Sequence, residues 1–570
     1  MGMFSNTKKI KFLVFFYILF QLVYGLVPID YKINLSDGSN IRLIVDDLAS
    51  DAVVDLRLGL NSRIYAGTSG GVSFVDYSNL NIDFFHFEDS NLPNGGNPSI
   101  ITEDLGNGED MIVVSGIVNC GTEVCGSGIA WSLDSGNTWS YTEQPTDQIP
   151  DCESITNPSI CSPASTGCSY NPTNNPVCTY QGSVIPFNWN GSTLYSNPIT
   201  VTERNISYDI SIDVNNGYIY IASWAGMLRR LKFTDQNPSW NLVPLPVDIN
   251  PDSGLTFETT SCGGYGNSYI YNPVDPIWGS STSNSGGNHN HKAYSVHVDG
   301  GTIWVGTANG VNKGIINGNC IDWTHYTTTD GLSGNWVIDV VPQDIGSTNR
   351  IWLISWDLVS PVTPHGLTYT DDYGATWNVV NQFNNPEDGG SDSAIVYNLF
   401  YDNNEMYAAT DKGLYYSTLG NEQSWSSYPI PEDCFEDTEK VYTYIKEGNL
   451  EFVGTPNGLI YTCSVNQCGN GWCNEEYVED NIHSDLGVYP NPASNYTNFI
   501  FPVANLRSNL TGSVDVFNFA MEQVKSNVSC FNDGENLKCD YDNINLSNGV
   551  YFCRLTYGNK EVWGKLMIIN

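Results

Sequence analysis

The chain has 570 residues and is strongly acidic, with 62 aspartate and glutamate residues against 23 lysine and arginine residues and a formal net charge of -39. Such a surface repels phosphate backbones and anionic lipid, which argues against nucleic acid as a partner. At this length two or more domains are expected. The many Gly, Asn, Tyr and Trp residues favour short strands and turns, so we predict an all-β protein.

The first residues have the pattern of an export signal. Lys8, Lys9 and Lys11 precede the apolar run FLVFFYILF, and the small residue Gly25 follows it. This order is typical of a cleavable signal peptide, here over residues 1–25. An uncleaved anchor is the alternative, but the run is short for a membrane span. No later segment is long enough to cross a bilayer, so we expect no transmembrane segment in the mature chain.

Fifteen cysteines in an exported chain are expected to form disulfide bonds. Most of them cluster, at Cys120 and Cys125, at Cys152, Cys161, Cys168 and Cys178, at Cys463, Cys468 and Cys473, and at Cys530, Cys539 and Cys553. They lack the paired CxxC spacing of a zinc ribbon, which favours disulfides over metal. An odd count leaves at least one thiol unpaired, or paired outside the chain.

A repeated strand–glycine-turn–strand unit runs through residues 30–463. It appears in RIYAGTSGGVSFVD, DMIVVSG, YIYIASWAGMLRRL, TIWVGTANGV, RIWLISWD, EMYAATDKGLYYS and LEFVGTPNGLIYT. Its spacing is mostly that of a four-stranded propeller blade, which predicts a seven-bladed β-propeller. Two long inserts, Asp151–Gln181 and Pro251–Lys292, could conceal another unit, so six or eight blades would also fit. We expect the N-terminal strand IRLIVDDL to complete the last blade.

Two segments repeat one spacing of Asp, Gly and Trp. WSLDSGNTW contains Asp134, Gly136 and Trp139, and TDDYGATW contains Asp372, Gly374 and Trp377. Aspartate accepts backbone N–H groups in a tight turn, glycine allows positive φ, and tryptophan buries its ring. The segments resemble the Asp-box of sialidase-type BNR repeats, where it forms the turn between the outer strands of a blade. The resemblance implies a structural role for both aspartates, with catalysis as the alternative.

The strands between these boxes are similar to the propellers found ahead of two-component regulators. The similarity is carried by TTDGLSGNWVIDVV, residues 328–341, and by GTANG, residues 306–310. It extends loosely over residues 40–463. No kinase follows in this sequence, so a sensor role is not implied.

The composition changes after Cys463. Residues 464–485 read as a polar linker, and residues 486–570 as a domain with alternating strands such as SVDVFNF and VYFCRLTY. Its motifs are YPNP at Tyr489, Pro490, Asn491 and Pro492, and LxxGVYF with Gly549 and Tyr551. They resemble the type A C-terminal sorting domain of the type IX secretion system, although Ala520 stands near the usual glycine turn.

That resemblance implies a small Ig-like β-sandwich handled by the secretion machinery at the outer membrane. Such a tail is commonly removed as the protein is anchored to surface polysaccharide or released. A carbohydrate-binding sandwich is the alternative. The expected destination is the outer cell surface or the medium.

Three kinds of site compete on the propeller. The Asp-boxes suggest a sialidase-like or other glycoside hydrolase, whose sialidase form needs an arginine cluster, a Tyr/Glu pair and an acid. Arginines are scarce here, and Arg63 and Arg350 each open a blade strand, which favours a structural role. The R-I-P phrase of sialidases is also missing. We therefore expect no enzyme, with the hydrolase as the alternative.

A metal site is the second kind. GNHNHKAYSVH brings together His289, His291 and His297, and an HxH on a strand would place both rings on one face. The Gly/Asn-rich surroundings favour solvated histidines instead. We expect neither a metal nor another cofactor.

A binding or adhesion module is the third kind and the one we predict. ASWAG places Trp224 where other units have Thr68 or Thr307, and ISWDL places Trp356 there, followed by Asp357. Strand ends of a propeller face its rims or its channel, where ligands bind. Aromatic rings beside a carboxylate suit a glycan or protein ligand. The alternative is that both tryptophans pack between blades.

Overall fold

The structure is a computed structural model of the whole chain. It describes residues 29–33, 48–50, 52–78, 82–149, 151–154, 168–170, 178–180, 184–246, 270–271, 289–346, 349–356, 364–385, 393–435, 439–463, 472–475, 487–489, 496–502, 512–518, 522–532, 536–542, 546–557 and 560–568. The predicted signal peptide lies outside these residues. The chain divides into two compact units, with Leu48–Glu476 in unit 1 and Tyr477–Asn570 in unit 2.

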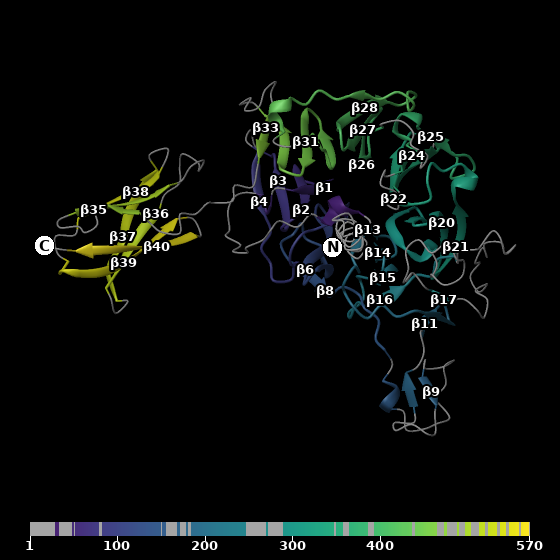
Figure 1. Cartoon of the computed structure of the whole chain (residues 1–570), viewed down its shortest axis with the longest axis horizontal. Coiled ribbons are helices and arrows are strands. Elements are labelled where there is room, and N and C mark those ends of the chain that lie inside the picture. The colour runs from purple at the N-terminus through teal and green to yellow at the C-terminus, as the bar shows by residue number, and fades with distance from the viewer. Residues whose placement is uncertain are drawn as a thin grey trace, which may run out of the picture. The chain divides into compact units, whose positions relative to one another are not determined.

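Unit 1 contains, in its described part, seven antiparallel sheets of four strands each, every one with its strands in chain order (Figure 1). Sheets 1 to 3 consist of β1 (Val53–Leu58), β2 (Arg63–Thr68), β3 (Val72–Asp76) and β4 (Asp83–His86); β5 (Ile100–Asp104), β6 (Asp110–Cys120), β7 (Glu123–Ser132) and β8 (Ser140–Thr142); and β13 (Ser207–Asp213), β14 (Tyr218–Ser223), β15 (Met227–Lys232) and β16 (Trp240–Leu242).

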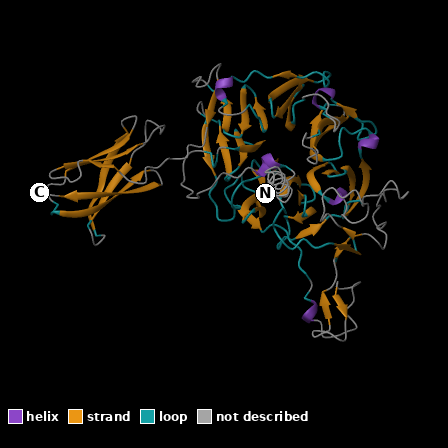
Figure 2. Ribbon diagram, in the orientation of Figure 1, coloured by secondary structure: helices purple, strands orange, loops and turns teal. Residues whose placement is uncertain are grey.

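Figure 2 shows that unit 1 consists mainly of strands joined by loops, and sheets 4 to 7 continue the same order. They consist of β18 (Ala293–Asp299), β19 (Thr302–Thr307), β20 (Gly310–Asn317) and β21 (Cys320–Tyr326); β22 (Val337–Asp344), β23 (Asn349–Trp356), β24 (His365–Thr370) and β25 (Asn378–Val379); β26 (Val396–Asp402), β27 (Glu405–Thr410), β28 (Gly413–Thr418) and β29 (Ser426–Ser427); and β30 (Thr443–Glu447), β31 (Leu450–Thr455), β32 (Gly458–Thr462) and β33 (Trp472–Glu475).

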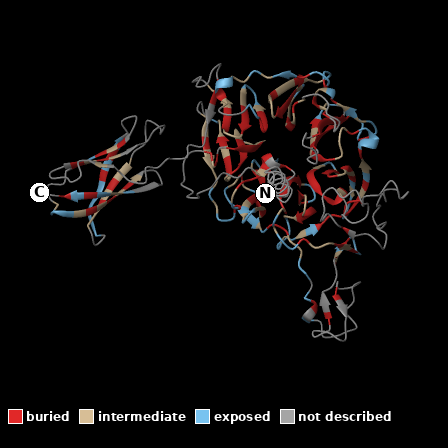
Figure 3. Ribbon diagram, viewed as in Figure 1, coloured by how far each residue is buried: buried red, intermediate tan, exposed pale blue. Residues whose placement is uncertain are grey.

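The sheets pack face to face and close into a ring. Each successive pair shares a cluster of buried apolar side chains, and Figure 3 shows buried residues gathered on the strands. Sheet 7 shares such a cluster with sheet 1, in which Phe452 lies with Val53. The fold is therefore a β-propeller, as predicted. The blade number stays a prediction, because residues 247–269 and 272–288 lie outside the described part.

The small residue of the repeated unit is explained by this packing. A Cβ atom on Gly67 would lie 2.8 Å from the carbonyl oxygen of Asn97. The equivalent distance is 2.5 Å from Gly306 to Val337 and 2.7 Å from Gly454 to Val53. In each case the oxygen belongs to the next sheet or to the segment that leads into it. Glycine here lets neighbouring sheets approach closely.

The threonine of the unit closes the turn that follows. Its hydroxyl donates a hydrogen bond to the carbonyl of the turn glycine in four sheets, at 2.8 Å for Thr68 and Gly71, 3.0 Å for Thr307 and Gly310, 2.7 Å for Thr410 and Gly413, and 2.9 Å for Thr455 and Gly458. The predicted hairpin with its glycine turn is confirmed.

The last sheet is completed differently from our expectation. Its fourth strand is β33, which pairs antiparallel with β32. β33 lies inside the predicted linker, and the disulfide between Cys463 and Cys473 ties it to the end of β32. The strand IRLIVDDL falls almost entirely outside the described residues. A short polar strand held by a disulfide has no hydrophobic pattern, which is why the sequence did not reveal it.

The two inserts add small elements to unit 1. The first contains η2 (Cys152–Ser154), β9 (Cys168–Tyr170) and β10 (Cys178–Tyr180), with a disulfide between Cys152 and Cys168. The second contributes β17 (Ile270–Tyr271), which pairs in parallel with β12 (Ser192–Ser196), itself paired with β11 (Ile185–Trp189). The remaining helices described are short 3-10 turns, namely η1 (Asp30–Ile33), η5 (His289–His291), η6 (Thr328–Asp330), η7 (Asn381–Phe383) and η8 (Glu432–Cys434).

Unit 2 is a small β-sandwich. Its strands are β34 (Gly487–Tyr489), β35 (Tyr496–Pro502), β36 (Gly512–Phe517), β37 (Gln523–Asn532), β38 (Asn536–Asp542), β39 (Gly549–Tyr557) and β40 (Lys560–Ile568). Its core includes Phe499, Val514, Leu555 and Leu566. Cys530 and Cys539 form a disulfide, whereas Cys553 is a free, buried thiol. Among the described cysteines, Cys553 is thus an unpaired thiol of the kind that the odd count predicts.

The close approach at the ring closure can be tested by substitution. We expect Gly454→Ala to lower the stability of unit 1 by about 1–3 kcal/mol, because the added methyl group must displace the Val53 carbonyl or the Thr443 side chain. Thermal unfolding followed by circular dichroism measures the effect. Gly549→Ala is the control, since its Cβ would have no heavy atom within 3.8 Å. Equal melting temperatures for Gly454→Ala and the unchanged chain would contradict this packing.

Candidate functional site

The direction of the strands divides the loops of unit 1 between two rims. In a sheet of four antiparallel strands, the turn between the second and third strands lies at the same end as the connections to the neighbouring sheets. The other two turns lie at the opposite end. We call the first end the pocket rim and the second the Asp-box rim. The tryptophans singled out in the sequence and the Asp-boxes therefore lie at opposite rims.

A pocket of about 430 Å3 opens at the pocket rim between sheets 4 and 5. Its walls come from the second–third turns of both sheets, from the segments that connect neighbouring sheets, and from His289. The lining includes His289, Trp336, Trp356, His365 and Asn385. None of the described lining residues is an aspartate or a glutamate.

Two polar residues, His365 and Asn385, lie at one side of the pocket and are positioned by hydrogen bonds between their main chains. The main chains of His365 and Asn385 exchange hydrogen bonds of 3.0 and 2.8 Å. The His365 ring lies 2.7 Å from the Ser393 hydroxyl through Nε2. The Asn385 side-chain oxygen is buried and has no hydrogen-bond partner among the described residues. A buried carbonyl oxygen left without a donor is costly, and because protein atoms cover this oxygen, the Asn385 side chain must turn toward the pocket to accept a hydrogen bond from a ligand.

The pairing register corrects our alignment of the two tryptophans. Val53 pairs with Thr68 in sheet 1, and the equivalent pairs are Ser207 with Ser223 and Val337 with Ser355. The residues that replace the threonine are therefore the two serines. Trp224 and Trp356 stand one position later, at the pocket rim, so the small hydroxyl residue is kept in both sheets.

Trp356 is both a core residue and part of the pocket wall. It is 3% exposed, and its Nε1 donates to the Val396 carbonyl at 2.9 Å. Its ring packs against Tyr397, with centroids 5.4 Å apart. Trp224 is half-buried, and the Lys292 ammonium lies over its ring, 5.4 Å from the ring centroid. Asp357 lies outside the described residues. A ligand-binding role for these three residues stays a prediction, and the burial of Trp356 favours the packing alternative for that residue.

The histidines do not lie on one strand as the HxH interpretation required. His289 and His291 form the short turn η5. His289 lines the pocket, whereas His291 is buried with Nε2 3.2 Å from the Leu245 carbonyl and its ring against Tyr271. No group of three or more His, Cys, Asp or Glu side chains suited to a metal ion occurs within the described residues.

Both Asp-box segments form the same hydrogen-bonded turn at the opposite rim. Oδ1 of Asp372 accepts the Thr376 N–H and the Thr370 hydroxyl, each at 2.8 Å, and Oδ2 accepts the Thr376 hydroxyl at 2.6 Å. Asp134 has the same three contacts at 2.8, 2.8 and 2.6 Å. Gly136 and Gly374 have φ of 88° and 93°. Hydrogen bonds from Thr376 hold the pKa of Asp372 below its usual range.

These turns support the structural interpretation of Asp134 and Asp372. The ring of Trp139 packs edge-on against Phe87, and that of Trp377 against Tyr326, so each tryptophan contacts the neighbouring sheet or its connection. All carboxylate oxygens named above accept hydrogen bonds from their own turn. An ionised carboxylate that accepts these hydrogen bonds stabilises the turn. It is poorly suited to act as a general acid, because a general acid must carry a proton.

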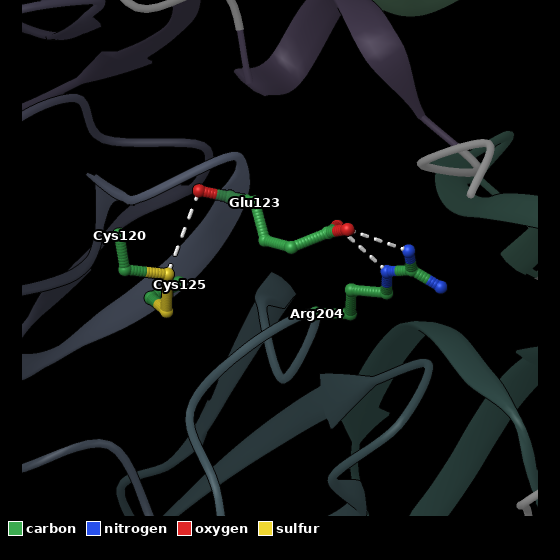
Figure 4. Close-up of a disulfide and its surroundings, with 4 residues drawn as sticks. All are labelled: Cys120, Glu123, Cys125 and Arg204. Carbon is green, nitrogen blue, oxygen red and sulfur yellow. Dashed lines mark hydrogen bonds and ion pairs between the residues drawn. A yellow bond between two sulfur atoms is a disulfide. The ribbon is translucent and has the colours of Figure 1, made fainter. Parts of the chain in front are cut away.

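Arginines of the ring are engaged in structural ion pairs. Arg350 lies 2.7 Å from Glu422 and also binds Asp371, while Arg229 lies 2.9 Å from Asp147. Figure 4 shows Arg204 paired through two 2.8 Å contacts with Glu123, next to the disulfide of Cys120 and Cys125 at the tip of the β6–β7 hairpin. These arginines serve the scaffold, which weakens the case for a sialidase-type carboxylate site.

Residues 487–570 match the family described as the secretion system C-terminal sorting domain. The C-terminal unit is this sorting domain. Of its predicted motif, Tyr489 lies in β34, and Pro490, Asn491 and Pro492 lie outside the described residues. Gly549 opens β39, and the Tyr551 hydroxyl donates to the Ser547 carbonyl at 2.9 Å. The chain is therefore handled by the type IX secretion system and is secreted or displayed at the outer cell surface.

No curated protein matches the chain. Among solved structures, the chain is similar to the β-propeller domain of Myceliophteria thermophila Cps50 (Swd1), with 9% identity, 72% of this chain and 95% of that chain covered, and a TM-score of 0.37. It is also similar to the extracellular domain assigned to a hybrid two-component system of B. thetaiotaomicron, with 12% identity, 90% and 68% covered, and a TM-score of 0.30. These scores are too low to carry an argument, so the fold rests on the strand order above. No helix in the described residues is long and apolar enough to cross a membrane.

The hydrogen bonds within the Asp-box turns are expected to contribute to the stability of unit 1. We expect Asp372→Ala to destabilise unit 1 by about 0.5–1.5 kcal/mol, because three N–H or O–H donors of this exposed turn lose their acceptor. Chemical denaturation measures the change, and Asp433→Ala, at an exposed residue, is the control. Loss of an activity without a change in stability would instead support the catalytic alternative.

The sorting domain predicts an effect on delivery. A chain without residues 486–570 is expected to keep a folded unit 1, because the two compact units have separate cores. It should remain inside the outer membrane. Cell fractionation and protease accessibility, compared with the full chain, measure this. Normal surface delivery of the shortened chain would contradict the assignment.

Proposed function

We propose that this exported propeller is a binding module and that its pocket at the pocket rim holds a small polar group of a glycan or protein ligand. The observation that carries the proposal is the pocket itself, with the buried, unpartnered side-chain oxygen of Asn385 in its wall. A sugar hydroxyl or a peptide N–H supplies the donor that this oxygen lacks. The edges of Trp336 and Trp356 add an apolar surface beside it.

Binding is favoured over hydrolysis by the chemistry of the pocket wall. Glycoside hydrolysis generally requires two carboxyl groups facing the bond that is cleaved. The described lining residues supply histidine, asparagine, serine and threonine but no carboxyl group. Such a set donates and accepts hydrogen bonds without a built-in acid and base pair. Delivery to the cell exterior by the sorting domain is consistent with a surface binding or adhesion role.

The pocket can be tested with the full chain on glycan and peptide arrays. We expect selective binding of one ligand class, weakened at least tenfold by Asn385→Leu and by His289→Ala. Asn241→Ala, which removes an amide from the outer strand β16, is the matched control and should bind normally. All variants should melt within a few degrees of the unchanged chain. Binding that both pocket variants leave intact would overturn the site, and turnover of a bound glycan would overturn the non-enzymatic role.

A further inference from the structure

The segment η1 lies at the centre of the propeller, where the first strands of the sheets meet (Figure 1). Ile29 is fully buried, Tyr31 is 5% exposed and Lys32 is 7% exposed. A buried lysine is rare and requires compensation for its lost hydration. These residues therefore occupy an interior site that is built to receive them.

Tyr31 is held by an aromatic cage. Its hydroxyl donates to the Tyr397 carbonyl at 3.0 Å. Its ring centroid lies 4.8 Å from that of Tyr397, 5.1 Å from that of Tyr442 and 5.7 Å from that of Trp356. The cage belongs to the apolar cluster at the centre, which collects side chains from all seven sheets. Ring contacts of this kind add to the energy of simple burial.

Lys32 is held by a carbonyl and by negative charge. Its ammonium donates to the Tyr208 carbonyl at 2.9 Å. Asp209 in β13 and Asp339 in β22 both interact electrostatically with it. Burial raises the pKa of Asp209 to about 7, and the Lys32 charge acts in the opposite direction, favouring the ionised carboxylate. The charge of Lys32 thus partly offsets that of the central carboxylates.

Asp209 and Asp55 also accept backbone hydrogen bonds from neighbouring sheets. Their negative charge still has to be balanced by nearby positive charge. Oδ2 of Asp209 accepts the N–H of Val296 in the next sheet at 2.9 Å, and Oδ2 of Asp55 accepts that of Ile100 at 3.2 Å. They therefore tie neighbouring sheets together. Arg57 lies 3.0 Å from Asp55. Lys32 supplies positive charge on the side of Asp209 and Asp339.

We propose that the centre of the propeller is a binding site for a peptide segment with tyrosine followed by lysine, and that residues 29–33 are its resident occupant. The aromatic cage selects the tyrosine, and the carbonyl with its neighbouring carboxylates selects the ammonium. This site shares the Trp356 side chain with the pocket of the proposed function but does not rest on that function. Because the occupant is part of the same chain, its high effective concentration keeps a free peptide out.

Binding of a free peptide to an emptied centre tests the proposal. The full chain carrying both Tyr31→Ala and Lys32→Ala is titrated with a fluorescent peptide of the sequence Ile-Asp-Tyr-Lys-Ile. We expect saturable binding at least tenfold tighter than to the unchanged chain, and a higher melting temperature of the variant with peptide. A peptide with norleucine in place of lysine is the control and should bind at least tenfold more weakly. Equal binding of both peptides, or equal binding to both proteins, would overturn the proposal.

A second measurement on the unchanged chain decides the matter if the double variant does not fold. Lysine acetylation by acetic anhydride is followed by mass spectrometry, comparing Lys32 with the exposed Lys525. Lys32 is expected to react at least tenfold more slowly until the protein is unfolded. Equal reaction rates in the folded protein would show that the centre does not hold this segment.

Discussion

Packing between sheet 7 and sheet 1, which closes the ring, is the constraint on which the propeller depends. No disulfide among the described residues joins sheet 7 to sheet 1, so Phe452 and its neighbours must meet Val53 across the closure. Close approach requires a position without a side chain, which is why Gly454 faces a carbonyl of the first strand. The same requirement recurs at Gly67 and Gly306. The glycine of the repeated unit is therefore explained by the short distance between neighbouring sheets. The threonine after it is explained by the hydrogen bond that closes the turn.

The alternation of strand direction places the Asp-box turns and the pocket at opposite rims. One rim carries the Asp-box turns, in which each carboxylate accepts hydrogen bonds from its own turn. The other rim carries the pocket, where the Asn385 oxygen has no described partner. The carboxylates of the Asp-boxes therefore lie at the rim opposite the pocket. Trp224 and Trp356 lie at the pocket rim, where Trp356 is mainly a packing residue, and a ligand-binding role for them stays a prediction.

The sequence was informative where structure is set locally and silent where it is set by distant contacts. Glycine turns, Asp-boxes and the sorting motif each lie within a few residues, so all-β architecture and the C-terminal domain were predictable. The position of Trp224 and Trp356 depended on a pairing register, which a one-residue shift alters. The strand β33 and the occupant Tyr31 depend on partners far along the chain. No local pattern specifies either of them.

The disulfide between Cys463 and Cys473 has a mechanical consequence. A protein held at a cell surface through its C-terminal side transmits any pulling force to the last strand before that side, which here is β33. Hydrogen bonds between β32 and β33 would separate one after another under such a load. Glu475 and Asn474 would separate from β32 first, and Cys473, which is bonded to Cys463 just beyond β32, would then pass the load to β32 through a covalent bond.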